Sequence, residues 1–212
     1  MVEYPLPADS GPHGLTEDAA GNVWFTGISQ NYIGMLDPQT GEVTQYPLPE
    51  GRGPHTPVFD RHGTLWFTLQ SGMVGRLVPA TGEITIVATP SANTCPYGIV
   101  SNSEGVLWYT DYARGYLGRF DPATGEVEEW ASPGGPESRP YGIATVGTVV
   151  WYSESAVRPN TLVRFDTETE RFQTWAIPSG GGVVRNMMAT ADGNLVLACS
   201  AVNRVALVDI GH

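Results

Sequence analysis

The chain has 212 residues and a formal net charge of −11, and all eleven of its basic residues are arginine. An acidic chain without a basic cluster repels phosphate backbones and anionic lipid, which excludes nucleic acid and membrane surfaces as partners. The lack of lysine excludes a P-loop and Schiff-base chemistry.

The apolar content is 41%, and 26 glycines and 17 prolines interrupt the chain. These frequent turn formers favour a compact β protein over long helices. No apolar run approaches the roughly 20 residues that cross a bilayer, and the first residues, "MVE", do not open a signal peptide. We therefore expect a soluble, cytoplasmic protein.

Four short strands are predicted at the start of the chain. The expected segments are Gly14–Thr16, Val23–Thr26, Ile33–Leu36 and Val43–Leu48. The intervening "DAAGN" and "DPQTGE" carry the Gly, Asn, Asp and Pro that turns require. A four-stranded meander of about 42 residues has the size of a β-propeller blade.

The same pattern returns along the rest of the chain. Trp24, Trp66, Trp108 and Trp151 are 42, 42 and 43 residues apart, and "DGNLVLA" places Val196 at the fifth tryptophan position. We expect these aromatic residues to pack between blades. The sequence predicts an all-β fold: one domain that forms a five-bladed β-propeller of four-stranded antiparallel blades, at approximately residues 8–49, 50–91, 92–134, 135–178 and 179–212.

The two ends of the chain complement each other. The fifth repeat contains only three strands, while "VEYPLP" at residues 2–7 matches "TQYPLP" at residues 44–49. We expect a strand in residues 1–7 to pair with the strand near residues 206–209, complete the last blade and remove an unpaired edge. A closed monomer is predicted.

A ring of variable residues is expected around one face of the central channel, where innermost strands begin and second strands end. Blade cores repeat while this ring varies, which is typical of a binding site on a repeated scaffold. Its first members are His13, His55, Tyr97, Tyr141 and Arg185. Next to them in the repeats are Arg139, Gln70, Tyr112, Asp111 and Glu154.

These residues suggest several kinds of chemistry. Each histidine could be a base or could donate a structural hydrogen bond. The tyrosines with Gln70 are predicted to bind substrate, and the two arginines could bind a substrate carboxylate or pair with nearby acids. Asp111 and Glu154 occupy equivalent places in adjacent blades, so they could hold a cation or share a proton.

The motifs "PHGL", "PYGI", "GNVWFT", "YIGMLDP" and "EVTQYPLP" resemble the blades of the virginiamycin B lyase (streptogramin lyase) family over nearly the whole chain. The resemblance implies a propeller that opens a cyclic depsipeptide by elimination across its ester bond. In the family, a histidine of the "PH" motif is the base, and glutamates on neighbouring positions hold Mg²⁺. By this resemblance, His55 and His13 are the candidate catalytic residues.

The glutamates of that motif are replaced in this chain. Gly53 and Gln70 stand at their places around His55, and Gly11 and Ile28 around His13. We therefore expect only weak Mg²⁺ binding near His55, with any metal site involving Asp111 or Glu154. The favoured reading is a lyase-like protein with a small-molecule pocket. One alternative is a non-catalytic propeller that binds a ligand or a protein. The other is an interaction scaffold, including the case of an artificial protein made by repeating a blade.

Overall fold

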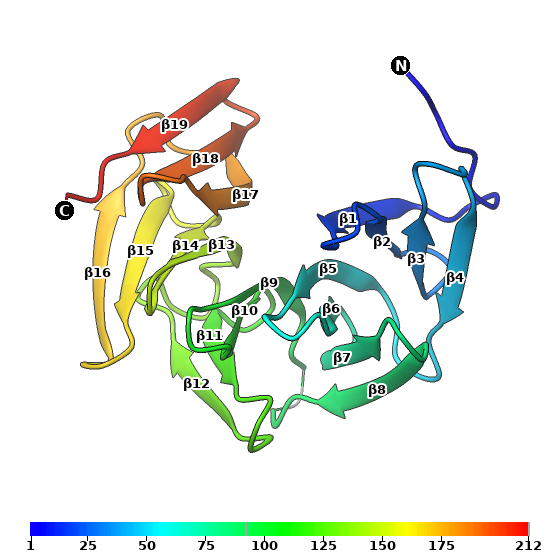
Figure 1. Ribbon diagram of the computed structural model, residues 1–212. Coiled ribbons are helices and arrows are strands. Elements are labelled where there is room, and N and C mark those ends of the chain that lie inside the picture. Colours follow the sequence, from blue (N-terminus) through cyan, green and yellow to red (C-terminus); the bar gives the residue numbers. More distant parts are fainter. Residues whose placement is uncertain (92, 212) are drawn as a thin grey trace. The chain divides into compact units, whose positions relative to one another are not determined.

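The computed structural model describes residues 1–91 and 93–211 and contains strands throughout, with no helix in these ranges. The strands form five antiparallel sheets, each built from consecutive strands as a meander (Figure 1). The predicted all-β, five-bladed organisation is confirmed. The chain divides into two compact units, residues 1–96 and 97–212, which are described in turn.

Unit 1 contains two blades of four strands each. Their strand order follows the chain, from the innermost to the outermost strand. All four predicted strands of the first blade are present. The strands of the first blade are β1 (Pro12–Glu17), β2 (Val23–Gly27), β3 (Tyr32–Leu36) and β4 (Val43–Pro47), and those of the second are β5 (Pro54–Phe59), β6 (Leu65–Leu69), β7 (Met73–Val78) and β8 (Glu83–Ala88).

Unit 2 contains three blades. The third and fourth have four strands each, and the fifth has three. The strands are β9 (Pro96–Ser101), β10 (Leu107–Asp111), β11 (Tyr116–Phe120) and β12 (Val127–Ala131); β13 (Pro140–Val146), β14 (Val149–Glu154), β15 (Thr161–Asp166) and β16 (Arg171–Ala176); and β17 (Val183–Ala189), β18 (Leu195–Ser200) and β19 (Arg204–Val208).

Trp24, Trp108 and Trp151 pack in hydrophobic clusters that join neighbouring blades, as the sequence predicted, and Trp66 is buried as well. All four are at most 5% exposed. Trp24 packs in one cluster with Leu65 of the next blade, and Trp151 packs with Leu197 of the blade that follows it. In three blades the tryptophan also stacks on an aromatic side chain of the outermost strand, with centroid distances of 5.5, 5.5 and 5.7 Å for Trp24–Tyr46, Trp108–Trp130 and Trp151–Trp175.

An aspartate six residues before the tryptophan closes the hairpin between the first two strands of a blade. In the first blade, Asp18 Oδ1 accepts hydrogen bonds from the backbone N–H groups of Ala20 and Asn22, each at 2.9 Å. Its Oδ2 accepts the Trp24 indole N–H at 2.8 Å. The second blade repeats this arrangement, with Asp60 Oδ2 2.9 Å from Trp66 Nε1. In these two blades, the turn aspartate is thereby hydrogen-bonded to the buried tryptophan.

The N-terminal segment differs from its prediction. No strand is formed by residues 1–7, which belong to unit 1, and the fifth sheet, in unit 2, has three strands. The expected pairing of residues 2–7 with residues 206–209 would join the two units and stays a prediction. Pro5 and Pro7 cannot donate backbone hydrogen bonds to a ladder. Within unit 1, Tyr4 instead donates its hydroxyl hydrogen bond to the Pro38 carbonyl at 3.0 Å.

Strand β19 has one strand neighbour in its sheet, and all of its side chains except Arg204 are apolar. On one face, Val205 and Leu207 are 76% and 72% exposed. Leu207 lies opposite Val196, which lies opposite Met188, so these three side chains form one row across the sheet. On the other face, Ala206 and Val208 line a groove of 660 Å³, together with Trp151, Leu162 and Trp175.

Candidate functional site

His13 and His55 begin neighbouring innermost strands, β1 and β5, and their rings are in contact. The ring centroids are 4.1 Å apart, with an angle of 48° between the planes. His13 is exposed, whereas His55 is 4% exposed. The sequence correctly places the two histidines side by side, but their surroundings differ.

A backbone carbonyl determines which nitrogen of His13 carries the proton. His13 Nδ1 lies 3.3 Å from the His55 carbonyl oxygen. A carbonyl oxygen only accepts hydrogen bonds, so Nδ1 carries the hydrogen and Nε2 of the neutral ring keeps its lone pair. Because His13 is exposed, this lone pair can meet a ligand. His55 Nδ1 lies 2.9 Å from Thr56 Oγ1, and its burial favours a structural role.

In each unit, a threonine two residues after a tryptophan links two neighbouring innermost strands. Thr26 Oγ1 accepts the Gly14 N–H at 2.9 Å and donates to the His55 carbonyl at 3.0 Å. This relay holds the backbone that positions the two histidines. The sequence reasoning missed it, although its constant spacing from the tryptophan is a usable signal. Unit 2 repeats the relay: Thr110 Oγ1 accepts the Gly98 N–H at 3.0 Å and donates to the Tyr141 carbonyl at 2.9 Å.

The residues around the histidines do not fit a magnesium site. Gly11 and Gly53 have φ of 57° and 66°, which disfavours any other residue. A Cβ atom at Gly11 would lie 2.4 Å from Ser29 Oγ, and one at Gly53 would lie 2.8 Å from Gln70 Oε1. Gln70 therefore packs directly over the glycine backbone. No group of three or more His, Cys, Asp or Glu side chains suited to a metal occurs in the described part of the chain.

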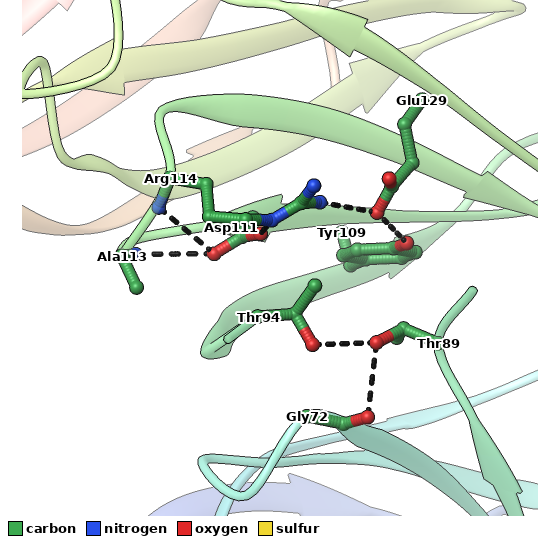
Figure 2. A network of polar contacts seen from close by, with 8 residues as sticks. All are labelled: Gly72, Thr89, Thr94, Tyr109, Asp111, Ala113, Arg114 and Glu129. Atoms are coloured by element: carbon green, nitrogen blue, oxygen red, sulfur yellow. Dashed lines mark hydrogen bonds and ion pairs between the residues drawn. The ribbon is translucent and has the colours of Figure 1, made fainter. Parts of the chain in front are cut away.

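Asp111 is fully buried in a hydrogen-bonded ion network within the third blade (Figure 2). Its Oδ2 is 2.6 Å from Arg114 Nε, and its Oδ1 accepts the backbone N–H groups of Ala113 and Arg114 at 3.1 and 3.3 Å. Arg114 continues to Glu129 at 2.6 Å, and Glu129 also accepts the Tyr109 hydroxyl. Burial, together with the Glu129 charge, raises the pKa of Tyr109, so this phenol stays a donor. Asp111 thus closes the turn after β10.

Glu154 is likewise surrounded by donors from the protein. It is 1% exposed, and its Oε1 accepts hydrogen bonds from Ser132 Oγ and the Gly134 N–H, both at 2.6 Å. Its Oε2 accepts the Thr161 hydroxyl. Ser132 Oγ is also 2.8 Å from the Tyr152 hydroxyl. These contacts connect the end of the third blade to the fourth, which is a structural task for this carboxylate.

Five of the predicted substrate-binding residues come together in unit 2, and we call them the tyrosine–arginine cluster: Tyr97, Tyr112, Arg139, Tyr141 and Arg185. Tyr97 stacks on Tyr112 with centroids 4.4 Å apart and planes 12° apart. Tyr141 contacts both rings, at 4.9 Å from Tyr97 and 5.6 Å from Tyr112. The three phenols thus form one aromatic surface at the ends of β9, β10 and β13.

The two arginines of this cluster contact its phenols. The Arg139 guanidinium carbon is 5.4 Å from the centre of the Tyr112 ring, and its Nη1 is 3.3 Å from the Tyr112 hydroxyl. The Arg185 side chain is hydrogen-bonded to Tyr141. Burial raises the pKa of Tyr141, against the opposing effect of the Arg185 charge, so this phenol remains neutral at neutral pH. Both guanidinium groups are on exposed residues.

Comparison with known proteins finds a family that matches nearly the whole chain. Residues 1–208 match the virginiamycin B lyase family. A virginiamycin B lyase from Nocardia farcinica is 29% identical over 110 residues, which are 52% of this chain and 37% of that protein. The chain therefore matches little more than a third of this curated relative's length.

Solved structures agree with this match. Virginiamycin B lyase from Staphylococcus aureus superimposes with a TM-score of 0.86 at 25% identity, over 96% of this chain and 68% of that one. A streptogramin B lyase structure gives a TM-score of 0.88 at 28% identity, over 98% and 68% of the two chains. With the repeated blades and the family match over nearly every residue, this chain belongs to the virginiamycin B lyase family.

Proposed function

We propose that this chain is a lyase-like protein that acts on a cyclic or ester-containing small molecule, with His13 as its general base. The observation that supports this most directly is the hydrogen bond between His13 Nδ1 and the His55 carbonyl. It leaves an accessible basic nitrogen on the "PH" histidine. A catalytically inactive histidine-to-alanine variant of the Staphylococcus aureus lyase has been solved with quinupristin, which links a histidine to catalysis in that relative.

The proposed step is a β-elimination. His13 Nε2 removes the proton on the carbon next to a carbonyl group, and the electron pair forms a carbon–carbon double bond as the neighbouring carbon–oxygen bond breaks. The ester leaves as a carboxylate, and the His13 imidazolium returns its proton to water. His55 packs against the base and fixes its orientation. The proposed step is written without a metal, because glycines stand where the carboxylates of the family pattern would be.

Quinupristin is a suitable probe for this proposal because it is the ligand in the relative's structure. Elimination gives a ring-opened product of unchanged mass, whereas hydrolysis adds the mass of one water, so chromatography with mass spectrometry separates the two. We expect the wild-type chain to form the product of unchanged mass. The H13A variant should lose this turnover while its Tm stays close to that of wild type.

His62→Ala is the matched control, since His62 is an exposed histidine in the turn between β5 and β6. This variant should convert quinupristin at the wild-type rate. Turnover by H13A equal to that of H62A would exclude His13 as the base. The absence of any ring-opened product from wild-type protein would exclude the activity on this substrate.

A second candidate function is non-catalytic binding of a small molecule on the same scaffold. The glycines at positions 11 and 53 favour it, because they remove the carboxylates that hold the metal in the family pattern. Calorimetry with quinupristin separates the two candidates. Binding heat without a ring-opened product supports the binding protein, and conversion supports the lyase.

A further inference from the structure

Arg139 has a backbone conformation that arginine rarely adopts. Its φ is 52°, in the left-handed region, where a side chain other than glycine is strained. The backbone hydrogen bond from Ser155 N to Arg139 O, at 3.1 Å, matches those from Ile28 N to Gly11 O and from Gln70 N to Gly53 O, at 3.2 and 3.0 Å. Arg139 therefore occupies the place at which the first two blades have glycine.

Strain of this kind is found mainly where a side chain has a function. At this place Gly11 and Gly53 adopt φ of 57° and 66° without strain, so the backbone itself does not require an arginine. What arginine adds in the fourth blade is a guanidinium over the Tyr112 ring. The structure thus points to a use for this positive charge that the other blades do not have.

The cluster gathers two arginine side chains in an acidic protein. The chain has 22 acidic and 11 basic residues, and Arg114, Arg119 and Arg164 each form ion pairs with carboxylates. Arg139 and Arg185 form no such pair among the residues that the structure describes. Their guanidinium groups keep donors for an additional acceptor, because a guanidinium has five N–H groups.

We propose that the tyrosine–arginine cluster binds a small organic carboxylate. A planar guanidinium pairs with the two oxygens of a carboxylate through parallel hydrogen bonds. Arg139 and Arg185 come from two adjacent blades and reach the same group of phenols. The three phenol rings add an apolar surface, so an aromatic carboxylate such as benzoate matches the cluster. Because the cluster lies within unit 2, this inference goes beyond the role of His13 and does not depend on it.

Benzoate is the first probe, titrated into the full chain by calorimetry at constant ionic strength, with chloride as the counter-anion. Acetate and inorganic phosphate are titrated in parallel. We expect benzoate to bind more tightly than acetate, because only benzoate offers a ring to the phenols, and both to bind more tightly than phosphate. Equal binding of phosphate and benzoate would overturn the assignment to a carboxylate, and the absence of benzoate binding would overturn the site.

The decisive variant is Arg139→Gly, which removes the guanidinium and gives the backbone the residue that suits its φ. We expect R139G to bind benzoate at least about tenfold more weakly while its Tm stays equal to, or rises above, that of wild type. R185Q should weaken binding similarly. Arg171→Gln, at an exposed arginine on β16 outside the cluster, is the control and should leave affinity unchanged.

The variants also separate a ligand-binding role from a structural one. If Arg139 serves only to stabilise the phenols, R139G lowers the Tm and benzoate binds the R139G/R185Q double variant as it binds wild type. Either result would overturn the proposal. Since H13A leaves the cluster intact, benzoate binding by H13A at wild-type affinity is expected whether or not the lyase activity exists.

Discussion

At Asn102, the third blade lacks an acceptor that the first two blades provide. Asn102 Oδ1 accepts the backbone N–H groups of Glu104 and Val106, both at 3.0 Å, as Asp18 does with its own turn. The Trp108 indole N–H is buried and has no partner, because the other polar atom of an asparagine side chain is a donor. The replacement of one carboxylate oxygen by an amide nitrogen in this turn therefore leaves the Trp108 indole N–H without a hydrogen-bond acceptor.

Asn102→Asp should restore this hydrogen bond and stabilise the fold. We expect the free energy of unfolding at neutral pH to rise by about 1 kcal/mol, the usual value of one intramolecular hydrogen bond. Urea denaturation measures the change. Asp18→Asn is the reciprocal control in the first blade and should cost a similar amount. The explanation fails if D18N destabilises the protein and N102D leaves it unchanged.

The Asp18 carboxylate also makes stability depend on pH. Burial raises its pKa, but hydrogen bonds from Trp24, Asn22 and Ala20 outweigh this effect and lower it below the ordinary 3.8. A depressed folded-state pKa contributes stability that is complete above 3.8 and is lost as the pH falls through the folded value. We expect the Tm to fall less steeply on acidification in D18N than in wild type. Equal slopes of Tm against pH in D18N and wild type would show that the pKa of Asp18 is the same in the folded and unfolded states.

At the scale of the strands, the threonine relay connects one blade to the next. Thr110 is fully buried, accepts the Gly98 N–H and donates to the Tyr141 carbonyl. Thr110→Val keeps the shape but leaves both backbone groups without this partner. We expect a loss of roughly 1–3 kcal/mol in the free energy of unfolding, with little loss in Thr110→Ser. If valine and serine behave alike, packing and not the hydrogen bonds explains the threonine.

The strands were largely predictable because their signals are local. Tryptophan spacing and turn residues located all four strands of the first blade to within a few residues. Long-range consequences were harder to predict. The sequence placed His13 beside His55, but it did not predict that the His55 carbonyl fixes the tautomer of His13. It also could not show that Glu154 accepts hydrogen bonds from Ser132 and Gly134. The expected strand at residues 1–7 rested on sequence similarity alone.

At the scale of the molecule, the exposed apolar row on β19 and its sheet predicts association with other chains. Met188, Val205 and Leu207 are 65%, 76% and 72% exposed, and β19 has an edge that no strand of its sheet covers. Exposed apolar edge strands pair with other chains. We expect the apparent mass in size-exclusion chromatography to rise with protein concentration, and the V205K/L207K variant to elute independently of it. Concentration-independent elution of wild type would contradict this expectation.

The left-handed backbone conformation of Arg139 has a consequence for engineering. Averaging the blades of a repeat protein into a consensus sequence is a common route to stability. For this chain, the first two blades contribute aspartate at the position of Asn102 and glycine at the position of Arg139. The first exchange adds a hydrogen bond to a tryptophan, whereas the second relaxes the backbone and removes a guanidinium from the tyrosine–arginine cluster. A selection for heat resistance alone would keep both exchanges. The exchange at Arg139 would then remove binding of the proposed carboxylate ligand.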